Sequence, residues 1–261
     1  MTLVDTEDHG AVRHIVLNRP DKRNAFNSEL IADLAEAVRA TAAAPEIHVV
    51  VLRGEGPVTS SGVDLKELAS QTGDGSLALL RSFRKRWIDV VNALEEMPKP
   101  VVCQIRGAMI GGALETALGC DLRVAAQDAV LGLPETRIGL IPDVGGSSRL
   151  PQLVGLGRAK ELILTGKLID GTEAERIGLV NRAVPADELE EATAALVREL
   201  LACAPVAVGL AKRVIDASAR PALSTTLELE IALQNVCAAT EDFREGAHAF
   251  AEKRQPEFSG R

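Results

Sequence analysis

The sequence has few aromatic residues, which make up only 2% of its 261 positions, while apolar residues of all kinds make up 46%. A core of this composition must be mainly aliphatic. No run of about twenty uncharged apolar residues exists, the length that a membrane-spanning helix needs, so we expect no membrane partner. Basic residues are outnumbered by acidic ones, 29 to 37, and the net charge of −8 argues against a nucleic-acid partner. We interpret a local basic strip, residues 81–86, as a solvated helix face.

Cysteine and histidine are also scarce, and neither type is arranged as metal ligands. None of the four histidines is paired with Cys, Asp or Glu at metal-ligand spacing, so no metal site is expected. The cysteines form no Cys-x-x-Cys pair, and we interpret them as buried free thiols, which fits a reducing cytosol. The acidic N-terminus has no apolar run and resembles neither a signal peptide nor a transit peptide, which favours a cytoplasmic location. The four cysteines are Cys103, Cys120, Cys203 and Cys237.

Strand and helix patterns alternate along residues 1–187, which predicts an α/β fold. An apolar face along 28–40, with Asn27 or Ser28 as its cap, predicts a helix. Thr172 and Glu175 have the spacing of a capping box at a later helix start. After about Asp187 the pattern is helical only, and we expect residues 188–261 to serve packing or assembly. The predicted strands are 12–17, 47–52, 101–105, 122–125 and 130–133, and the other predicted helices are 87–94, 112–118, 158–165, 189–201, 206–217, 223–240 and 243–254.

Two glycines and two glutamates form the most informative pattern. Gly111 and Gly112 open the predicted helix 112–118. A helix start presents unpaired N–H groups and a partial positive charge, and glycine lets a ligand approach them, so such a site can hold an oxyanion. Glu115 lies one turn inside, and Glu135 lies on another element after Pro134. Each residue alone has an ordinary structural explanation, but together they favour acid/base chemistry beside a developing negative oxygen.

Other common catalytic motifs are missing: there is no Gly-x-Ser-x-Gly elbow and no Gly-x-x-x-x-Gly-Lys-Ser/Thr loop. Along nearly the whole chain the sequence instead resembles the enoyl-CoA hydratase/isomerase family, the crotonase superfamily. Seven segments in order carry this resemblance: 17–25, 61–68, 107–121, 134–146, 164–166, 173–174 and 250–256.

The resemblance implies a crotonase-like spiral of ββα units over residues 1–187, with the active site, and a helical region over 188–261 that drives trimerisation and completes the CoA site. It implies a homotrimer or a dimer of trimers. The substrate would be an acyl-CoA thioester that brings its own coenzyme A, so no separate cofactor is expected. The backbone N–H groups of Val63 and Gly112 would hold the enolate oxygen. Residues matched to substrate or CoA binding are Lys22, Arg23, Ala25, Ser61, Asp64, Leu65 and Lys253.

Hydratases of the family have a glutamate at both positions matched by Glu115 and Glu135. This favours syn addition of water to a trans-2-enoyl-CoA, with Glu115 activating the water and Glu135 delivering the proton to C2. Asp143 departs from the hydratase pattern, because some isomerases place a catalytic aspartate there. An enoyl- or dienoyl-CoA isomerase using Asp143 and Glu135 is therefore the first alternative, although we prefer to interpret Asp143 as a turn residue after Pro142. The second alternative is a non-catalytic acyl-CoA binding protein, which the intact glutamate pair disfavours.

Overall fold

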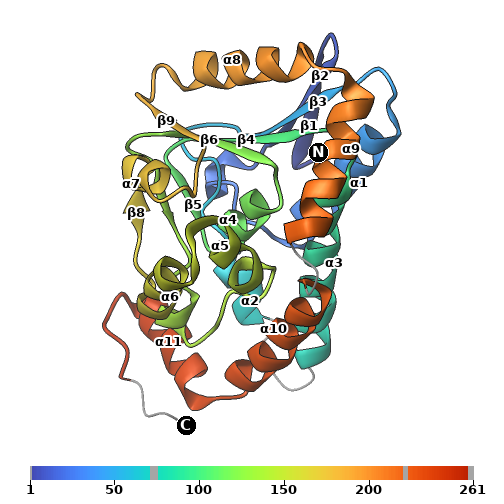
Figure 1. Cartoon of the computed structure of the whole chain (residues 1–261). Helices are drawn as coiled ribbons and strands as arrows, with labels where there is room; N and C mark the ends of the chain where they lie inside the picture. The colour runs from blue at the N-terminus through green and yellow to red at the C-terminus, as the bar shows by residue number, and fades with distance from the viewer. Residues whose placement is uncertain (1, 71–75, 220–222, 258–261) are drawn as a thin grey trace.

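The computed structural model of the chain describes residues 2–70, 76–219 and 223–257. Among these residues, six strands form the larger sheet in the order β1-β2-β3-β4-β6-β9 (Figure 1). Its first pair is antiparallel and every other pair is parallel. The central strands are apolar and buried on both faces, as expected for parallel strands covered on both sides. The bounds are Val4–His9 for β1, Val12–Leu17 for β2, Val49–Gly54 for β3, Val101–Ile105 for β4, Leu122–Ala126 for β6 and Arg182–Val184 for β9.

A smaller sheet has the order β5-β7-β8, with strands Ala108–Ile110, Val130–Gly132 and Ile169–Asp170. The chain leaves β4 of the larger sheet, enters β5 of the smaller one and continues into helix α4 (Gly112–Leu118). It then repeats the step from β6 to β7 and the 3₁₀ helix η2 (Glu135–Ile138). These repeats are the predicted ββα-like units. The first of them places the start of α4 at the centre of the molecule (Figure 1).

The remaining helices surround these sheets. Helix α1 is capped as predicted, because Oδ1 of Asn27 accepts the N–H of Leu30 at 2.9 Å. Helix α3 is longer than predicted and begins at Ser76. The bounds are Ser28–Ala43 for α1, Leu65–Ser70 for α2, Ser76–Glu96 for α3, Gly146–Val154 for α5, Leu156–Thr165 for α6, Gly171–Arg176 for α7, Leu189–Leu201 for α8, Pro205–Ala219 for α9, Leu223–Ala238 for α10 and Glu241–Glu252 for α11, with a 3₁₀ helix η1 at Pro20–Lys22.

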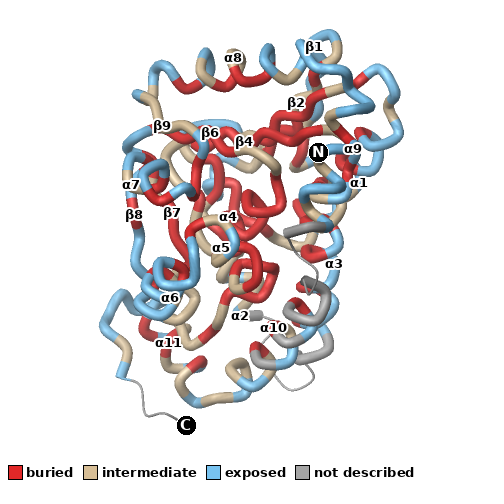
Figure 2. Tube along the Cα trace, in the orientation of Figure 1, coloured by how far each residue is buried: buried red, intermediate tan, exposed pale blue. Residues whose placement is uncertain are grey.

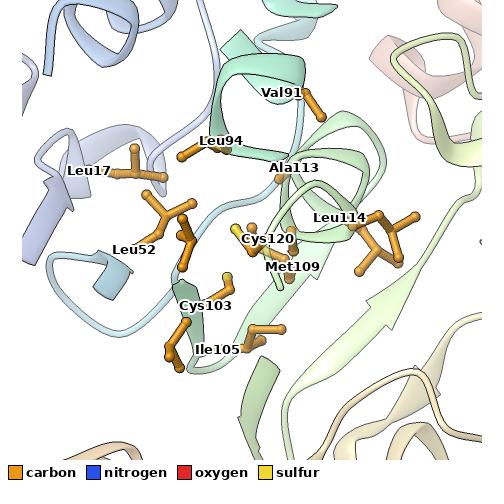
Figure 3. Packing of buried hydrophobic residues seen from close by; sticks show 14 of the residues in the cluster. Leu17, Leu52, Val91, Leu94, Cys103, Ile105, Met109, Ala113, Leu114 and Cys120 are labelled. Atoms are coloured by element: carbon orange, nitrogen blue, oxygen red, sulfur yellow. The ribbon is translucent and has the colours of Figure 1, made fainter. Parts of the chain in front are cut away.

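The core gathers around helix α4, every residue of which is buried (Figure 2). Side chains of the sheet and of α3 meet it, among them Leu52, Leu94 and Ile105 (Figure 3). These residues are aliphatic, as the composition predicted. Since α4 carries Glu115, the catalytic candidate on this helix is held by the most densely buried part of the fold.

After Asp187 the described residues form the helices α8 to α11, as the pattern predicted, but these helices do not stand apart from the sheets. Helix α8 packs against β3, β4, β6 and β9, and α11 packs against η2 (Figure 1). Helix α9 leaves Val206, Leu210 and Val214 exposed. Within the described residues, no single helix has the length and apolar composition of a membrane span; only α8 and α9 taken together, which meet at 101°, would meet that criterion.

Two local predictions are wrong. Helix α7 begins at Gly171, and Oδ1 of Asp170 accepts the N–H of Glu173 at 2.8 Å. The cap is therefore Asp170, because an aspartate two residues earlier competes successfully with Thr172 for this role. Cys103 and Cys120 are buried as expected, but Cys237 is only partly buried and Cys203 is exposed, because the chain leaves the core at the end of α8.

Candidate active site

The two residues predicted to supply backbone N–H donors, Val63 and Gly112, come from distant segments and line one cavity. The N–H of Phe26 donates to the carbonyl of Gly62, and the N–H of Asp64 donates to the carbonyl of Phe26, both at 2.8 Å. Because successive residues of an extended chain point their backbone groups to opposite sides, the N–H of Val63 points away from Phe26. The N–H of Gly112, at the start of α4, has no partner within the helix. Neither group donates to an acceptor among the described residues, and both residues line the cavity.

The adjacent glycines at the start of α4 are required by different neighbours. A Cβ on Gly112 would lie 2.4 Å from the ring of Trp87, and a Cβ on Gly111, whose φ is +59°, would lie 3.0 Å from Oε1 of Glu135. The indole N–H of Trp87 donates to Oγ1 of Thr116 at 2.8 Å, which fixes the ring. Glycine at these two positions therefore lets α3 and Glu135 approach the helix start closely.

Glu115 is 1% exposed and is held by the turn that precedes α5. Its Oε2 atom accepts the N–H of Val144 at 2.7 Å and the N–H of Gly146 at 2.6 Å. Burial, followed by the nearby charge of Glu135, raises the pKa of Glu115 well above its usual value, while the Gly146 N–H opposes this shift. Both donors favour the ionised form of Glu115 and so oppose the effect of its burial.

Glu135 lies at the start of η2 and faces the same cavity. Its Oε2 atom is buried and meets no hydrogen-bond donor among the described residues. Burial raises the pKa of Glu135 to about 8. The side chain is therefore mainly protonated at neutral pH, and its Oε2 atom lacks the backbone donors that Glu115 has.

Asp143 stands in a turn, but its side chain is buried against Arg84 rather than exposed. Nη1 of Arg84 donates to Oδ2 of Asp143 at 2.8 Å, and Nη2 donates to Oδ1 of Asn235 at 2.6 Å. Burial raises the pKa of Asp143 to about 6, and Arg84 limits the rise. Asp143 is therefore not an ordinary exposed turn residue, because its side chain is buried and the residue lines the cavity.

The interpretation of residues 81–86 as a solvated helix face is wrong for Arg84. Arg81, Lys85 and Arg86 are exposed, but Arg84 is only 6% exposed and lines the cavity with Asp143. Its neighbours on α3 include the buried Phe83 and, three residues on, Trp87. Position on this apolar face was the signal that could have identified Arg84 as buried.

The cavity that these groups share has a volume of about 70 Å³. Apart from the charged groups its wall is mainly apolar. No group of three or more His, Cys, Asp or Glu side chains within the described residues is arranged to hold a metal ion. The arrangement suits an apolar chain whose reacting end meets two carboxyl groups and two N–H donors. The apolar wall includes Val63, Leu68, Phe83, Trp87, Leu140 and Phe243.

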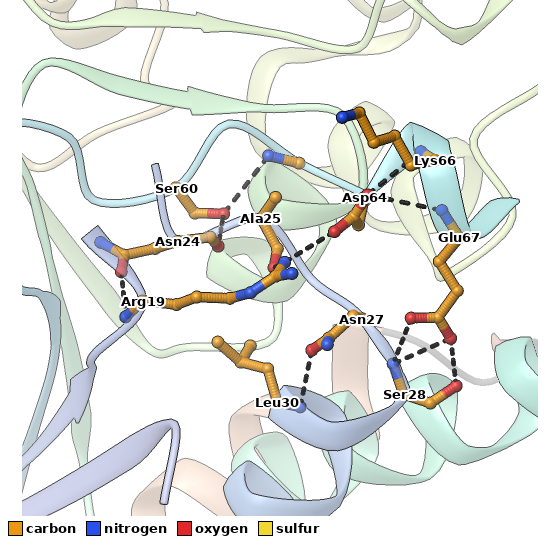
Figure 4. A network of polar contacts seen from close by, with 11 residues as sticks. Arg19, Asn24, Ala25, Asn27, Ser28, Leu30, Ser60, Asp64, Lys66 and Glu67 are labelled. Atoms are coloured by element: carbon orange, nitrogen blue, oxygen red, sulfur yellow. Dashed lines mark hydrogen bonds and ion pairs between the residues drawn. The ribbon is translucent and has the colours of Figure 1, made fainter. Parts of the chain in front are cut away.

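The segments matched to CoA binding are joined by a polar network (Figure 4). Nη1 of Arg19 donates to the carbonyl of Ala25 at 3.0 Å and to Oδ2 of Asp64 at 2.7 Å. Oγ of Ser60 donates to the carbonyl of Asn24 at 2.8 Å, and the N–H of Ser61 donates to the carbonyl of Arg23 at 3.0 Å. Residues 22–25 and 61–65, distant in sequence, therefore lie side by side.

Within this network, Asp64 has a structural role that the sequence did not indicate. Besides its ion pair with Arg19, its Oδ1 atom accepts the N–H of Lys66 at 3.1 Å at the start of α2, where Leu65 is the first residue. Lys22 and Arg23 are exposed. Lys253 ends α11 in a left-handed conformation, and no hydrogen bond or ion pair among the described residues joins it to residues 22–25.

Comparisons with known proteins agree with this geometry. The family model for enoyl-CoA hydratase/isomerase matches residues 7–261. The chain is 34% identical to the enoyl-CoA isomerase/hydratase fer4 of Mycosarcoma maydis, with 96% of this chain and 93% of the relative covered. It is 38% identical to the human mitochondrial enoyl-CoA hydratase domain-containing protein 2, with 96% and 86% covered.

A solved structure of an enoyl-CoA hydratase from Mycobacterium avium subsp. paratuberculosis K-10 superimposes with a TM-score of 0.88 at 31% identity, with 98% of each chain covered. The predicted crotonase-like fold is thus confirmed. With the family match over most of its length and these relatives, the chain belongs to the enoyl-CoA hydratase/isomerase family.

Proposed function

We propose that this protein is an enoyl-CoA hydratase that adds water syn to a trans-2-enoyl-CoA thioester. The observation that carries this proposal is the different hydrogen bonding of two carboxyl groups in one cavity. Glu115 accepts two backbone N–H groups on one oxygen, while Oε2 of Glu135 meets none among the described residues. One group is thereby favoured as the base and the other as the acid, and hydration requires both.

In the proposed reaction, the thioester oxygen accepts the N–H groups of Val63 and Gly112. Glu115 removes a proton from water as the water oxygen bonds to C3, and the negative charge that develops on the thioester oxygen is stabilised by these two donors. Glu135 then gives its proton to C2. The cycle ends when Glu115 loses and Glu135 regains a proton, and no cofactor beyond the coenzyme A of the substrate takes part.

An enoyl- or dienoyl-CoA isomerase is the second candidate, because Asp143 is buried in the same cavity. In that reaction Asp143 and Glu135 would move a proton between two carbons of the acyl chain, with no water added. The ion pair between Asp143 and Arg84 makes Asp143 a weaker base. We therefore prefer hydration to isomerisation. A non-catalytic binding protein is disfavoured, because buried carboxyl groups are costly and binding alone does not need them.

Incubation with crotonyl-CoA, a 3-enoyl-CoA and a 3,5-dienoyl-CoA distinguishes these candidates. Hydration adds the mass of one water to crotonyl-CoA, and in water labelled with heavy oxygen the product carries the label. Isomerisation changes no mass in ordinary water but introduces deuterium from D₂O. The proposal is wrong if purified enzyme isomerises but does not hydrate, and the binding-protein alternative holds if it does neither while still binding acyl-CoA.

A further inference from the structure

The turn that holds Glu115 is itself held from the other side by a residue of α10. Three successive residues of this turn donate their N–H groups to carboxyl oxygens. Val144 and Gly146 donate to Glu115, while Gly145, between them, donates to Oε2 of Glu230 at 3.1 Å. The N–H of Gly145 therefore points to Glu230, while the N–H groups of Val144 and Gly146 on either side of it point to Glu115.

Glu230 occupies a place where a carboxyl group is costly. The residue is 3% exposed, and its Oε1 atom meets no hydrogen-bond donor among the described residues. Burial raises the pKa of Glu230 to about 7. An aliphatic side chain would fill the same space without this desolvation cost. Stability alone does not explain the carboxyl group, but the contact with Gly145 does.

The turn has little freedom to find another position. Gly145 has a φ of +111°, and a Cβ there would lie 1.7 Å from Nη1 of Arg149. That nitrogen donates to the carbonyl of Val144 at 3.4 Å, and Nη2 of Arg149 is fixed by Glu95 at 2.9 Å. The turn is thus confined by Arg149 from α5 and by Glu230 from α10.

Helix α10 makes further polar contacts with the site. Oε1 of Gln234 accepts the N–H of Ile141 at 2.9 Å, and Oδ1 of Asn235 accepts Nη2 of Arg84 at 2.6 Å. Glu230 and Gln234 are four residues apart on a helix and so share one face. This face lies over the loop that leads from η2 to α5, and Glu230 is its contact with the Glu115 turn.

We propose that Glu230 is a positioning residue that aligns the N–H groups of Val144 and Gly146 on Glu115. This inference builds on the proposed role of Glu115 as the base. Loss of the Glu230 acceptor would let the turn rotate, weaken the two bonds to Glu115 and disfavour its ionised form. The charged groups around Glu115 are Glu135 from η2, Asp143 from the turn, Arg149 from α5 and Glu230 itself.

A pair of variants separates the hydrogen bond from the charge. Glu230→Gln keeps an acceptor for Gly145 without the charge, and Glu230→Leu fills similar space without an acceptor. For crotonyl-CoA hydration, we expect Glu230→Gln to keep kcat within about threefold of the wild type. Glu230→Leu should lower kcat by about tenfold or more with little change in KM, as loss of alignment without loss of binding predicts. The acid limb of its pH profile should lie at higher pH than in Glu230→Gln. Glu228→Gln, an exposed position on the same helix, is the control.

Hydrogen exchange gives a readout that does not depend on activity. The peptide covering residues 141–149 should exchange faster in Glu230→Leu than in Glu230→Gln, whose exchange should match the wild type. If Glu230→Leu fails to fold, Glu230→Ala replaces it in the same measurements, with the same expected results. Equal kcat, equal acid limbs and equal exchange in the two variants would overturn the inference. Absence of hydration and isomerisation in the wild type would instead overturn the proposed function, while the exchange comparison would still test the contact with Gly145.

Discussion

The cavity has two walls that are built differently. The core wall consists of Val63, Gly112, Glu115 and Glu135, which the strands and the start of α4 bring together. The helical wall consists of Arg84, Asp143, Gln234 and Phe243, supplied by α3, the turn before α5, α10 and α11. The core wall presents backbone N–H groups and two carboxyl groups, whereas the helical wall presents an ion pair and apolar surface.

This difference separates two tasks. Groups of the core wall are fixed by backbone geometry and can stabilise charge where it develops without reorganising. Groups of the helical wall are side chains held by long-range contacts, which can set the shape and charge balance around the acyl chain. We therefore expect substitutions in the core wall to act on the chemical step and substitutions in the helical wall to act more weakly or more selectively.

The largest effect is expected in the core wall. Glu115→Gln and Glu135→Gln should each lower the kcat for crotonyl-CoA hydration by on the order of 10²-fold or more, because each removes a positioned base or acid. The test is steady-state kinetics on variants that still unfold in one cooperative transition. Near-wild-type rates in either folded variant would contradict the proposed mechanism.

The protonation states of the core wall can be read from the pH dependence. Since the pKa of Glu135 is raised to about 8, hydration should fall as pH rises above that value, by about tenfold per pH unit once the acid is lost. The measurement is kcat/KM for crotonyl-CoA between pH 6 and pH 10, with dead-end binding of an acyl-CoA as a control for affinity. A rate that stays flat to pH 10 would remove Glu135 as the proton donor.

In the helical wall, Asp143→Asn tests the two candidate reactions against each other. Asparagine preserves the size of the side chain and an acceptor for Arg84, so hydration should change by only about threefold if Asp143 takes no part in proton transfer. If the enzyme is an isomerase, the same change should lower dienoyl-CoA isomerisation by about 10²–10⁴-fold while acyl-CoA binding persists. The second result, with negligible crotonyl-CoA hydration by the wild type, would reverse our order of the candidates.

Stability should also depend on two buried acids, Glu135 of the core wall and Glu230 behind it. Folding raises the pKa of Glu135 from 4.5 to about 8 and that of Glu230 from 4.5 to about 7. The folded state therefore binds these protons more tightly than the unfolded state, and their contribution is present below about pH 4.5 and is lost as pH rises to about 8. Melting temperatures over this range should decline more steeply for the wild type than for Glu135→Gln. Parallel curves for the two proteins would argue that Glu135 is not buried as described.

The weakest effect on the reaction is expected outside both walls. The trimer implied by the family resemblance stays a prediction, and the exposed apolar residues Val206, Leu210 and Val214 of α9 support an assembly surface. Light scattering at micromolar concentration should give the mass of a trimer or hexamer, and Leu210→Glu should lower it. A monomeric wild type would refute the assembly.

The sequence predicted best where local pattern and burial agree. The bounds of β2, β4, α4 and α8 are as predicted, because each is an apolar run or an apolar face with clear ends. Strand β1 was missed because its sequence, VDTEDH, is acidic and mostly exposed at the sheet edge. Helix α5 was missed because it begins with Gly and Ser and contains Pro151.

The site residues likewise divide into those that a local pattern relates and those that only the fold brings together. Gly112 and Glu115 are three residues apart, so a helix start was enough to relate them. Arg84 and Asp143 are 59 residues apart, and Glu230 lies 85 residues from Gly145. No local pattern brings such pairs together, and their polar side chains resemble those of solvated helix faces. The sequence therefore offered Asp143 as a candidate base but gave no sign of its pairing with Arg84, and the rest of the helical wall could be described only once the fold was known.

The contact between Trp87 and Gly112 also makes the protein its own optical reporter. The chain contains a single tryptophan and no tyrosine, and that indole lines the cavity while it packs on the start of α4. Intrinsic fluorescence thus comes from one site, next to a backbone N–H proposed to hold the thioester oxygen. Occupancy of the cavity should change the emission without any label, so that ligand binding can be followed in variants that have lost all turnover.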